Sequence, residues 1–300
     1  IRDLVQQLYG EQLLGFYEAE MDQMFLLQGA QFDPVEQMTF AHESVHAMVD
    51  ETYDIDGKLA FTDEKCDHQG ERCQALRALM EGDASLASAL WMMGNMSAGE
   101  QAEIAAVGEQ QSPVLSSAPV IYQEDLMFPY SLGTTFVSYL YQQGGWAAVD
   151  AAYLNPPVST EQIMHPDRYP ADVPAAVTLP DLLPVLGEGW ELLDQDTLGE
   201  WHSLLLLTSG VDPQANHTAE AASPAVTGWG GDLYQVYFHA ENQLVVLVLK
   251  TQWDTPEDAS EFYNFLGQHV VARFDLAESE TELIDMFNAM RLGYAQFQLK

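Results

Sequence analysis

The pattern with the clearest chemical meaning in this sequence is His42-Glu43-Ser44-Val45-His46. In a helix, residues four apart project from one face, so both imidazoles could bind the same ion. Imidazole nitrogen is a common ligand of zinc, and Glu43 reaches the same side of the metal. From there Glu43 could take a proton from a metal-bound water and later pass it to a leaving amine. The spacing therefore predicts a hydrolytic zinc site.

A catalytic zinc ion needs a third protein ligand and one open position. The stretch Leu79–Ala84 supplies Glu81, which lies among apolar residues where an unpaired carboxylate would be costly. We predict that His42, His46 and Glu81 bind the metal, and that Asp83 orients one of the histidines. The alternatives without a metal are a helix with two histidines on a polar face, and a Glu81 that is exposed or paired with a cation.

Two long helices are expected to carry these ligands. Asp33 as the N-cap and Pro34 at the first helical position predict a helix that begins there and ends near Tyr53. Ala, Leu and Met at helical spacing predict a second helix from about Glu71 to Met93. A rigid helical support of this kind is what a catalytic metal site requires.

Upstream, the apolar stretches Leu13–Tyr17 and Met24–Leu27 flank polar residues and predict a β-hairpin. The second arm is a candidate for the strand that binds a substrate backbone by strand addition, although a plain core strand has the same composition. Residues 98–125 are expected to be helical at first and then loop-like, and residues 170–189 to form a Pro-rich loop. Other expected helices cover Ile1–Tyr9, Leu132–Gln143, Trp146–Tyr153, a short segment opened by Ser159, Asp196–Ser209 and Pro256–Arg273, and a second hairpin covers Leu233–His239 and Gln243–Thr251.

The charge balance restricts the partners of the chain. Ten basic residues stand against 46 acidic ones, for a formal net charge of -36. Such a field repels phosphate backbones and anionic lipid surfaces, so we expect no nucleic-acid partner. It suits solubility in salt, and it would attract cationic substrates or divalent ions. No stretch of the sequence has the roughly 18 consecutive apolar residues of a membrane-spanning helix.

Two cysteines, Cys66 and Cys73, lie seven positions apart. A local disulfide and a pair of free thiols are both open, and a disulfide would favour an exported, extracellular or cell-surface protein. His68 lies between them, but two cysteines and one histidine are too few for a structural zinc site, which usually has four protein ligands. Because the sequence starts with Ile1 and not Met, a signal, anchor or pro-segment could precede it.

The zinc motif and Glu81 together resemble the gluzincin metallopeptidases, the thermolysin-like branch of the zincins. The spacing from His46 to Glu81 is longer than in thermolysin, and Glu81-Gly82-Asp83-Ala84 differs from its Glu-x-x-x-Asp pattern, so the likeness is to a divergent bacterial gluzincin-like family. The motifs that contribute to the resemblance, over about residues 10–265, are Phe128-Pro129-Tyr130, Gly133, Phe136-Val137, Gly144-Gly145-Trp146, Ser159-Thr160-Glu161-Gln162, His165-Pro166, Tyr169, Gly228-Trp229-Gly230-Gly231-Asp232 and Trp253-Asp254.

This resemblance implies an α+β fold. Residues 1–215 would form a mainly helical, zincin-like metallopeptidase domain with an N-terminal β-hairpin, and residues 216–300 a smaller α+β region. It also implies a Tyr or His that stabilises the oxyanion, and the candidates are Tyr130 and His165. Tyr130 could equally be a half-buried tyrosine that caps a backbone group, and His165 a histidine at a helix C-terminus.

The function expected from these residues is zinc-dependent (Zn2+) hydrolysis of peptide bonds in a peptide or protein substrate. Two alternatives belong to other classes. One is a binding or scaffold protein that keeps a zincin-like fold and a metal without turnover, and the other is a zinc hydrolase of non-peptide amides or esters. Glu43 argues against the first, because a purely structural metal has no use for a carboxylate beside an open position.

Overall fold

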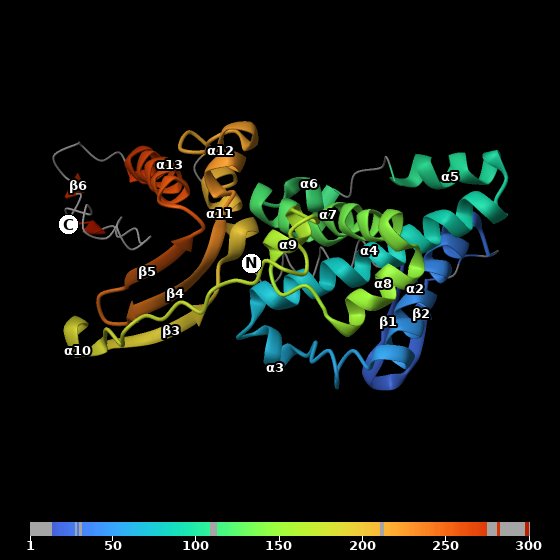
Figure 1. Ribbon diagram of the computed structural model, residues 1–300, viewed down its shortest axis with the longest axis horizontal. Helices are drawn as coiled ribbons and strands as arrows, with labels where there is room; N and C mark the ends of the chain where they lie inside the picture. Colours follow the sequence, from blue (N-terminus) through green and yellow to red (C-terminus); the bar gives the residue numbers. More distant parts are fainter. Residues whose placement is uncertain are drawn as a thin grey trace. The chain divides into compact units, whose positions relative to one another are not determined.

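The computed structural model describes residues 14–27, 29, 32–108, 113–210 and 213–274, and the backbone of residues 281–282 and 298–299. The expected helix over residues 1–9 lies outside this range. The chain has a mainly helical α+β fold, with a two-stranded hairpin near its start and a three-stranded sheet later in the chain (Figure 1). None of the helices within the described residues is long and apolar enough to cross a membrane.

The chain forms two compact units whose segments alternate along the sequence. Unit 1 comprises residues 1–63, 74–157 and 163–169, and unit 2 comprises residues 64–73, 158–162 and 170–300. This partition differs from the boundary expected after residue 215, because the sheet of unit 2 begins earlier, at Trp190.

Unit 1 is built on a hairpin and long helices. Strands β1 (Gly15–Glu18) and β2 (Gln23–Leu26) pair antiparallel around the short 3-10 helix η1 (Ala19–Met21), which confirms the expected hairpin. The hairpin packs against helix α2 (Pro34–Tyr53). The other helices that lie largely or wholly in this unit are α4 (Gly70–Asn95), α5 (Ala98–Gly108), α6 (Pro113–Ser117), α7 (Val120–Gly144) and α8 (Trp146–Leu154). Two short helices, α3 (Asp63–Cys66) and α9 (Thr160–Met164), contain residues of both units.

The start of α2 confirms the expected capping residues. The side chain of Asp33 accepts a hydrogen bond from the Glu36 N–H, and the Glu36 carboxylate accepts one from the Asp33 N–H, so the two form a capping box. Pro34 occupies the first turn, where a missing N–H costs nothing. The cap determines where α2 begins, and so where its two histidines lie along the helix.

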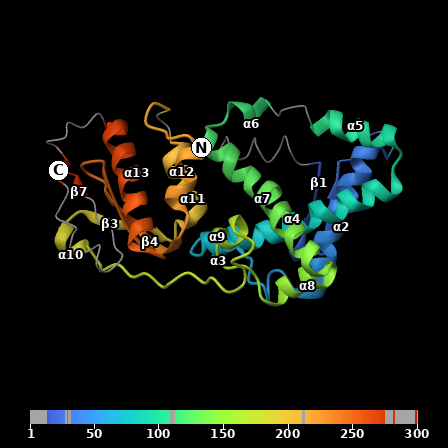
Figure 2. The same cartoon turned by 45° about the horizontal axis from the view of Figure 1, so that its top comes forward.

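Helices α4 and α7 cross at two glycines, and α7 runs across α4 in both views (Figures 1 and 2). A Cβ added at Gly82 would collide with the Gly133 carbonyl, and one added at Gly133 would collide with the Ala78 carbonyl. The two backbones therefore touch, and no side chain separates them. This contact holds the part of α7 around Gly133 directly against the turn of α4 that contains Glu81.

Helix α7 corrects one expectation from the sequence. Residues 98–125 were expected to become loop-like around Ser112-Pro113 and the next helix to begin only at Leu132, but α7 runs from Val120 to Gly144 with Pro129 inside it. Proline cannot donate to the carbonyl four residues earlier, which belongs to Asp125. The side-chain amide of Gln74 on α4 donates to that carbonyl at 3.3 Å instead. A tertiary hydrogen bond thus lets the helix continue through the proline.

Unit 2 contains the antiparallel sheet β3-β4-β5, formed by β3 (Trp190–Asp196), β4 (Trp229–His239) and β5 (Leu244–Trp253). Helices α11 (Gly199–Thr208) and α13 (Pro256–Phe274) pack against the sheet, and α12 (Ala219–Val226) packs against both of these helices. The remaining elements are α10 (Leu183–Leu186) and the two-residue strands β6 (Thr281–Glu282) and β7 (Gln298–Leu299). The β4–β5 hairpin and α13 confirm the expectations.

Three elements of unit 2 were not expected from the sequence. Strand β3 pairs with β4, but a register shift between Leu192 and Asp194 interrupts its period-two pattern. Helix α12 contains Pro224, and the short α10 lies in the Pro-rich stretch that was expected to be a loop.

Cys66 and Cys73 form a disulfide with their Cα atoms 5.6 Å apart, which decides between the two alternatives for this pair.

Candidate metal centre

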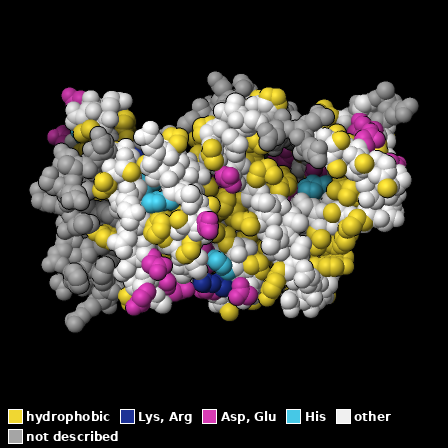
Figure 3. All heavy atoms as spheres, turned by 90° about the horizontal axis from the view of Figure 1, so that it is seen from above, with side chains coloured by type: hydrophobic (Ala, Val, Ile, Leu, Met, Phe, Trp, Pro, Cys, Tyr) yellow, Lys and Arg dark blue, Asp and Glu magenta, His cyan; other side chains and the backbone are white. Residues whose placement is uncertain are grey.

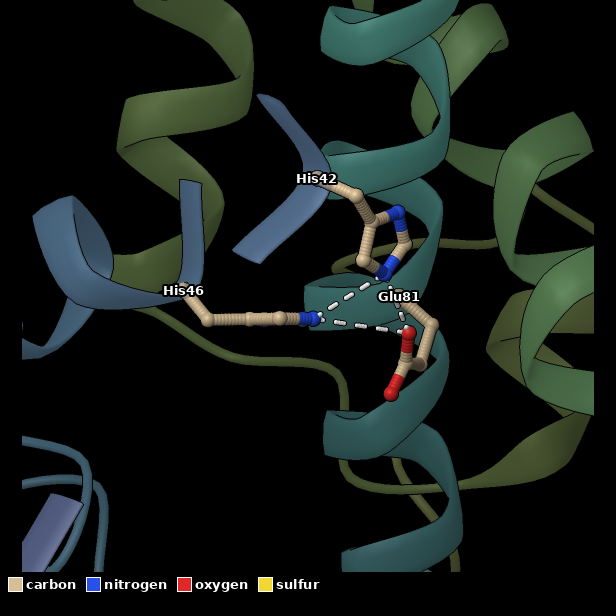
Figure 4. Close-up of side chains that lie close together, drawn as sticks. All are labelled: His42, His46 and Glu81. Atoms are coloured by element: carbon tan, nitrogen blue, oxygen red, sulfur yellow. Dashed lines mark hydrogen bonds and ion pairs between the residues drawn. The ribbon is translucent and has the colours of Figure 1, made fainter. Parts of the chain in front are cut away.

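Three side chains of unit 1 converge on one point (Figure 4). His42 and His46 project from one face of α2, and Glu81 reaches them from α4, although it lies 39 residues after His42 in the chain. The His42 Nε2 atom lies 3.1 Å from Oε2 of Glu81 and 3.2 Å from Nε2 of His46. The third side of this triangle, from His46 Nε2 to Glu81 Oε2, measures 3.5 Å.

These distances fit a tetrahedral metal ion. Ligand atoms about 2.0–2.1 Å from a tetrahedral zinc ion lie roughly 3.3–3.4 Å from one another. The three measured distances, 3.1, 3.2 and 3.5 Å, lie close to that value. Two imidazole nitrogens and one carboxylate oxygen also make up a donor set that zinc accepts, and they leave one corner of the tetrahedron open. The three residues predicted as ligands are therefore placed together, in an arrangement that can hold a metal.

Charge interactions within this cluster are strong. Burial acts to raise the pKa of Glu81, but hydrogen bonds from His42 and His46 and their charges outweigh it and lower that pKa to about 2. Burial acts to lower the pKa of His46, whereas Glu81, Glu43 and Asp83 raise it above its ordinary value. Glu81 is thus a carboxylate at neutral pH, as a metal ligand must be.

Glu43 lies beside the cluster on the same helix and is only 8% exposed. Burial raises the pKa of its carboxyl group, and the charges of His46 and His42 act in the opposite direction. The backbone N–H of Tyr17 on β1 also donates a hydrogen bond to this carboxylate. A carboxyl group with a raised pKa, held by the hairpin next to the two imidazoles of the cluster, has the properties that a general base needs.

Tyr130 reaches the same site from α7. It lies one turn before Gly133, so the close crossing of α4 and α7 brings its ring against the cluster. The rings of Tyr130 and His42 stack with their centroids 6.4 Å apart, and the Tyr130 hydroxyl donates a hydrogen bond to Glu81. Burial, followed by the charges of Glu81 and Glu43, raises the pKa of this phenol. Tyr130 is therefore a neutral hydrogen-bond donor at the metal centre.

Asp83 lies behind the site and interacts with two partners. The Tyr153 hydroxyl of α8 donates to its Oδ2 atom at 2.9 Å, and its charge acts on His46. Burial raises the pKa of Asp83 to about 6, although the Tyr153 hydrogen bond and His46 act to lower it. A role for Asp83 in orienting His46 fits these contacts. The hydrogen bond from Tyr153 was not expected from the sequence, because the two residues are 70 positions apart.

His165, the other oxyanion candidate, is not part of the convergent cluster. It follows α9, and its carbonyl accepts a hydrogen bond from the Arg168 N–H. Its assignment remains a prediction.

A second group of carboxylates belongs to unit 2. Oxygen atoms of Glu161, Asp172 and Asp254 lie within 4.8 Å of one another, but each of these residues has other interaction partners. Glu161 is buried and Asp254 exposed, and we assign no ion to this group.

Two downstream motifs of the resemblance, Ser159–Gln162 and Gly228–Asp232, contribute to the polar interior of unit 2. Thr160 donates hydrogen bonds to Glu71 through both its N–H and its hydroxyl group. Asp232 accepts from the Leu198 N–H, the Gly199 N–H and the Trp229 indole, and so holds the start of α11. These contacts explain the motifs as structural residues.

A family model described as a domain of unknown function (DUF8575) matches residues 190–290. No curated protein and no solved structure matches the chain. The matched segment begins with β3 and includes none of the residues of the metal centre.

Proposed function

We propose that this chain is a zinc-dependent peptidase of the gluzincin type, with a zincin-like metal-binding region in unit 1. One observation supports it most strongly: the ligand atoms of His42, His46 and Glu81 converge at tetrahedral distances, with the buried Glu43 carboxyl group beside them. A site with only a structural metal would have no use for that carboxyl group.

His42, His46 and Glu81 would hold the metal, which when bound supplies a Lewis acid that polarises the substrate carbonyl and lowers the pKa of a water molecule. Glu43 takes a proton from the attacking water, whose oxygen forms a bond to the carbonyl carbon of the peptide. Tyr130 donates a hydrogen bond to the oxygen that becomes negative. Glu43 then delivers the proton to the amide nitrogen as the C–N bond breaks, leaving a free amine and a carboxylate.

The proposal is tested by replacing Glu43 with Gln and measuring both metal content and peptide hydrolysis. We expect one zinc per chain in both proteins, because Glu43 is not a ligand, and a fall in kcat of about 10²–10⁴-fold, the usual contribution of a general acid–base group. Glu51→Gln is the matched control, since Glu51 is an exposed residue two turns further along α2. Full activity of Glu43→Gln would rule out this mechanism.

The same assay separates the other classes of function. A peptide library and a set of ester and non-peptide amide substrates are incubated with the protein, with and without a chelator. Cleavage of peptides that the chelator abolishes supports the peptidase. Cleavage of esters or other amides alone points to a different hydrolase, and bound zinc without any turnover points to a binding or scaffold protein.

We also infer that the protein is exported or lies at the cell surface. The observation in favour is the disulfide between Cys66 and Cys73, because such bonds persist in oxidising compartments. Cell fractionation with an antibody against the chain would check it.

A further inference from the structure

Arg77 is an exposed cation on the helix that carries Glu81. The two residues are four positions apart on α4, so they lie on the same side of the helix, one turn from each other. The arginine is therefore next to the metal centre of unit 1 although it is not one of the proposed ligands.

Among the described residues, Arg77 pairs with an aromatic ring and with no acidic side chain. Its guanidinium group lies over the ring of Phe61, 5.5 Å from the centroid, which supports its position by a cation–π interaction. Within the residues that the structure describes, no Asp or Glu forms an ion pair or hydrogen bond with it. This is unusual in a chain with 46 acidic and ten basic residues. On the face drawn in Figure 3, basic side chains occupy one small area while acidic ones are widely spread.

The charge of Arg77 acts on the metal centre itself. It lowers the pKa of the Tyr130 phenol, in opposition to burial and to the charges of Glu81 and Glu43, which raise it. Arg77 and Glu81 are one turn apart on the same side of α4, so the guanidinium group lies near the cluster that the Tyr130 ring contacts through His42. A substrate group that contacts Arg77 would be close to the scissile bond.

We propose that Arg77 binds a carboxylate group of the substrate, so that the enzyme prefers peptides with an anionic group next to the bond that is cleaved. This inference rests on the proposed peptidase function. A guanidinium group can bind both oxygens of a carboxylate at once, and an exposed, unpaired one loses little by doing so. The net charge of -36 acts against the approach of such a substrate, and Arg77 offsets this repulsion next to the site. The carboxylate can come from the C-terminus of the peptide or from an Asp or Glu side chain.

Binding is measured with the zinc-loaded Glu43→Gln protein, which can hold a peptide without cleaving it. The probes are N-acetylated, fluorescently labelled tetrapeptides in two matched pairs. One pair ends in a free carboxylate or a carboxamide, and the other contains Glu or Gln at one internal position. Adding Arg77→Gln to the Glu43→Gln protein should raise the Kd of a carboxylate peptide about tenfold, which is the usual order for the loss of a charge-assisted hydrogen bond. The pair that responds identifies the source of the carboxylate.

Three further variants make the result specific. Lys58→Gln removes one positive charge from an exposed position of unit 1 and should leave the carboxylate preference intact. Arg77→Lys keeps the charge without the planar fork and should give an intermediate Kd. Phe61→Leu removes the ring below the guanidinium group and should weaken the preference. Thermal unfolding of every variant shows that it is folded.

Two outcomes would overturn the proposal: equal Kd values for the carboxylate and neutral peptides with Arg77 present, or an equal loss for both types when Arg77 is replaced. The outcome is separable from that of the peptidase proposal. If the Arg77-dependent preference is measured but the wild-type protein cleaves no peptide, carboxylate binding stands and the peptidase function fails.

Discussion

At the scale of single residues, the metal centre contains two carboxyl groups with opposite properties. Glu81 is held as a carboxylate by two imidazoles, which lower its pKa to about 2 against the effect of burial. Burial raises the pKa of Glu43, and the charges of the same two imidazoles act to lower it without cancelling the effect of burial. Pairs of carboxyl groups whose environments separate their pKa values in this way commonly divide the roles of charge and proton transfer. In the proposed reaction, Glu81 is the metal ligand and Glu43 the general base.

Tyr130 contacts the cluster of His42, His46 and Glu81 from helix α7, and its hydroxyl has a role in the proposed reaction. Replacing it with Phe removes the hydroxyl that donates to Glu81 and, in the proposed reaction, to the developing oxyanion. We expect kcat to fall about 10²–10³-fold with little change in KM, because the hydrogen bond is strongest in the transition state. Steady-state kinetics with zinc content measured in parallel tests it, and a loss confined to KM would assign Tyr130 to substrate binding instead.

At the scale of elements, the site depends on how closely α4 and α7 approach. We predict that Gly133→Ala destabilises the protein by about 1–3 kcal/mol, because its new Cβ would meet the Ala78 carbonyl and push the helices apart. Metal affinity should fall as well, since the same crossing positions Tyr130 against Glu81. Thermal unfolding and a zinc titration measure the two effects.

Gly94→Ala is the matched control on α4. Nothing lies within 4 Å of a Cβ at this position, so the change should stabilise the helix by up to about 1 kcal/mol and leave metal binding as it is. If Gly133→Ala and Gly94→Ala changed stability and metal affinity equally, the close crossing of α4 and α7 would not be what supports the site.

At the scale of the whole molecule, stability should depend on the protonation of Glu71. This residue lies at the start of α4, and its Oε2 atom is buried without a hydrogen-bond partner. Burial raises its pKa to about 8, although the hydrogen bonds from Thr160 act to lower it. Above the ordinary value of 4.5, the unfolded chain loses this proton and the folded chain retains it. Glu71 therefore stabilises the fold fully below pH 4.5, and this contribution is lost as the pH rises to about 8.

Glu71→Gln should remove this pH dependence, because an amide does not titrate. The difference in unfolding free energy between wild type and variant is expected to change between pH 4.5 and 8, by at most about 1.4 kcal/mol per pH unit. Urea unfolding at several pH values measures it, and Glu191→Gln, at an exposed position of β3, is the control. A constant difference across this range would show that Glu71 is ionised in the folded protein.

Local signals in the sequence were sufficient for several parts of the fold. The Asp33 cap and Pro34 located the start of α2, and apolar or β-rich stretches on either side of a short polar segment located both hairpins. Such signals act through contacts within one or two turns, or across one tight connection, and so they can be read without knowing the rest of the fold. The four-residue spacing of His42 and His46 belongs to the same class, because helix geometry alone puts the two imidazoles on one face.

Tertiary structure decided what depends on segments far apart in the chain. It continued α7 through Pro129 by means of Gln74, and paired β3 with β4 in spite of an irregular pattern. It also brought Glu81 within 3.1 Å of His42 across 39 residues, and Tyr130 to the same point through a glycine crossing. The sequence by itself determined that two histidines project from one face of a helix with Glu43 next to the first of them. Only the packing of α2, α4 and α7 determined which carboxylate, phenol and guanidinium groups share their site, because those contacts exist only when the helices pack.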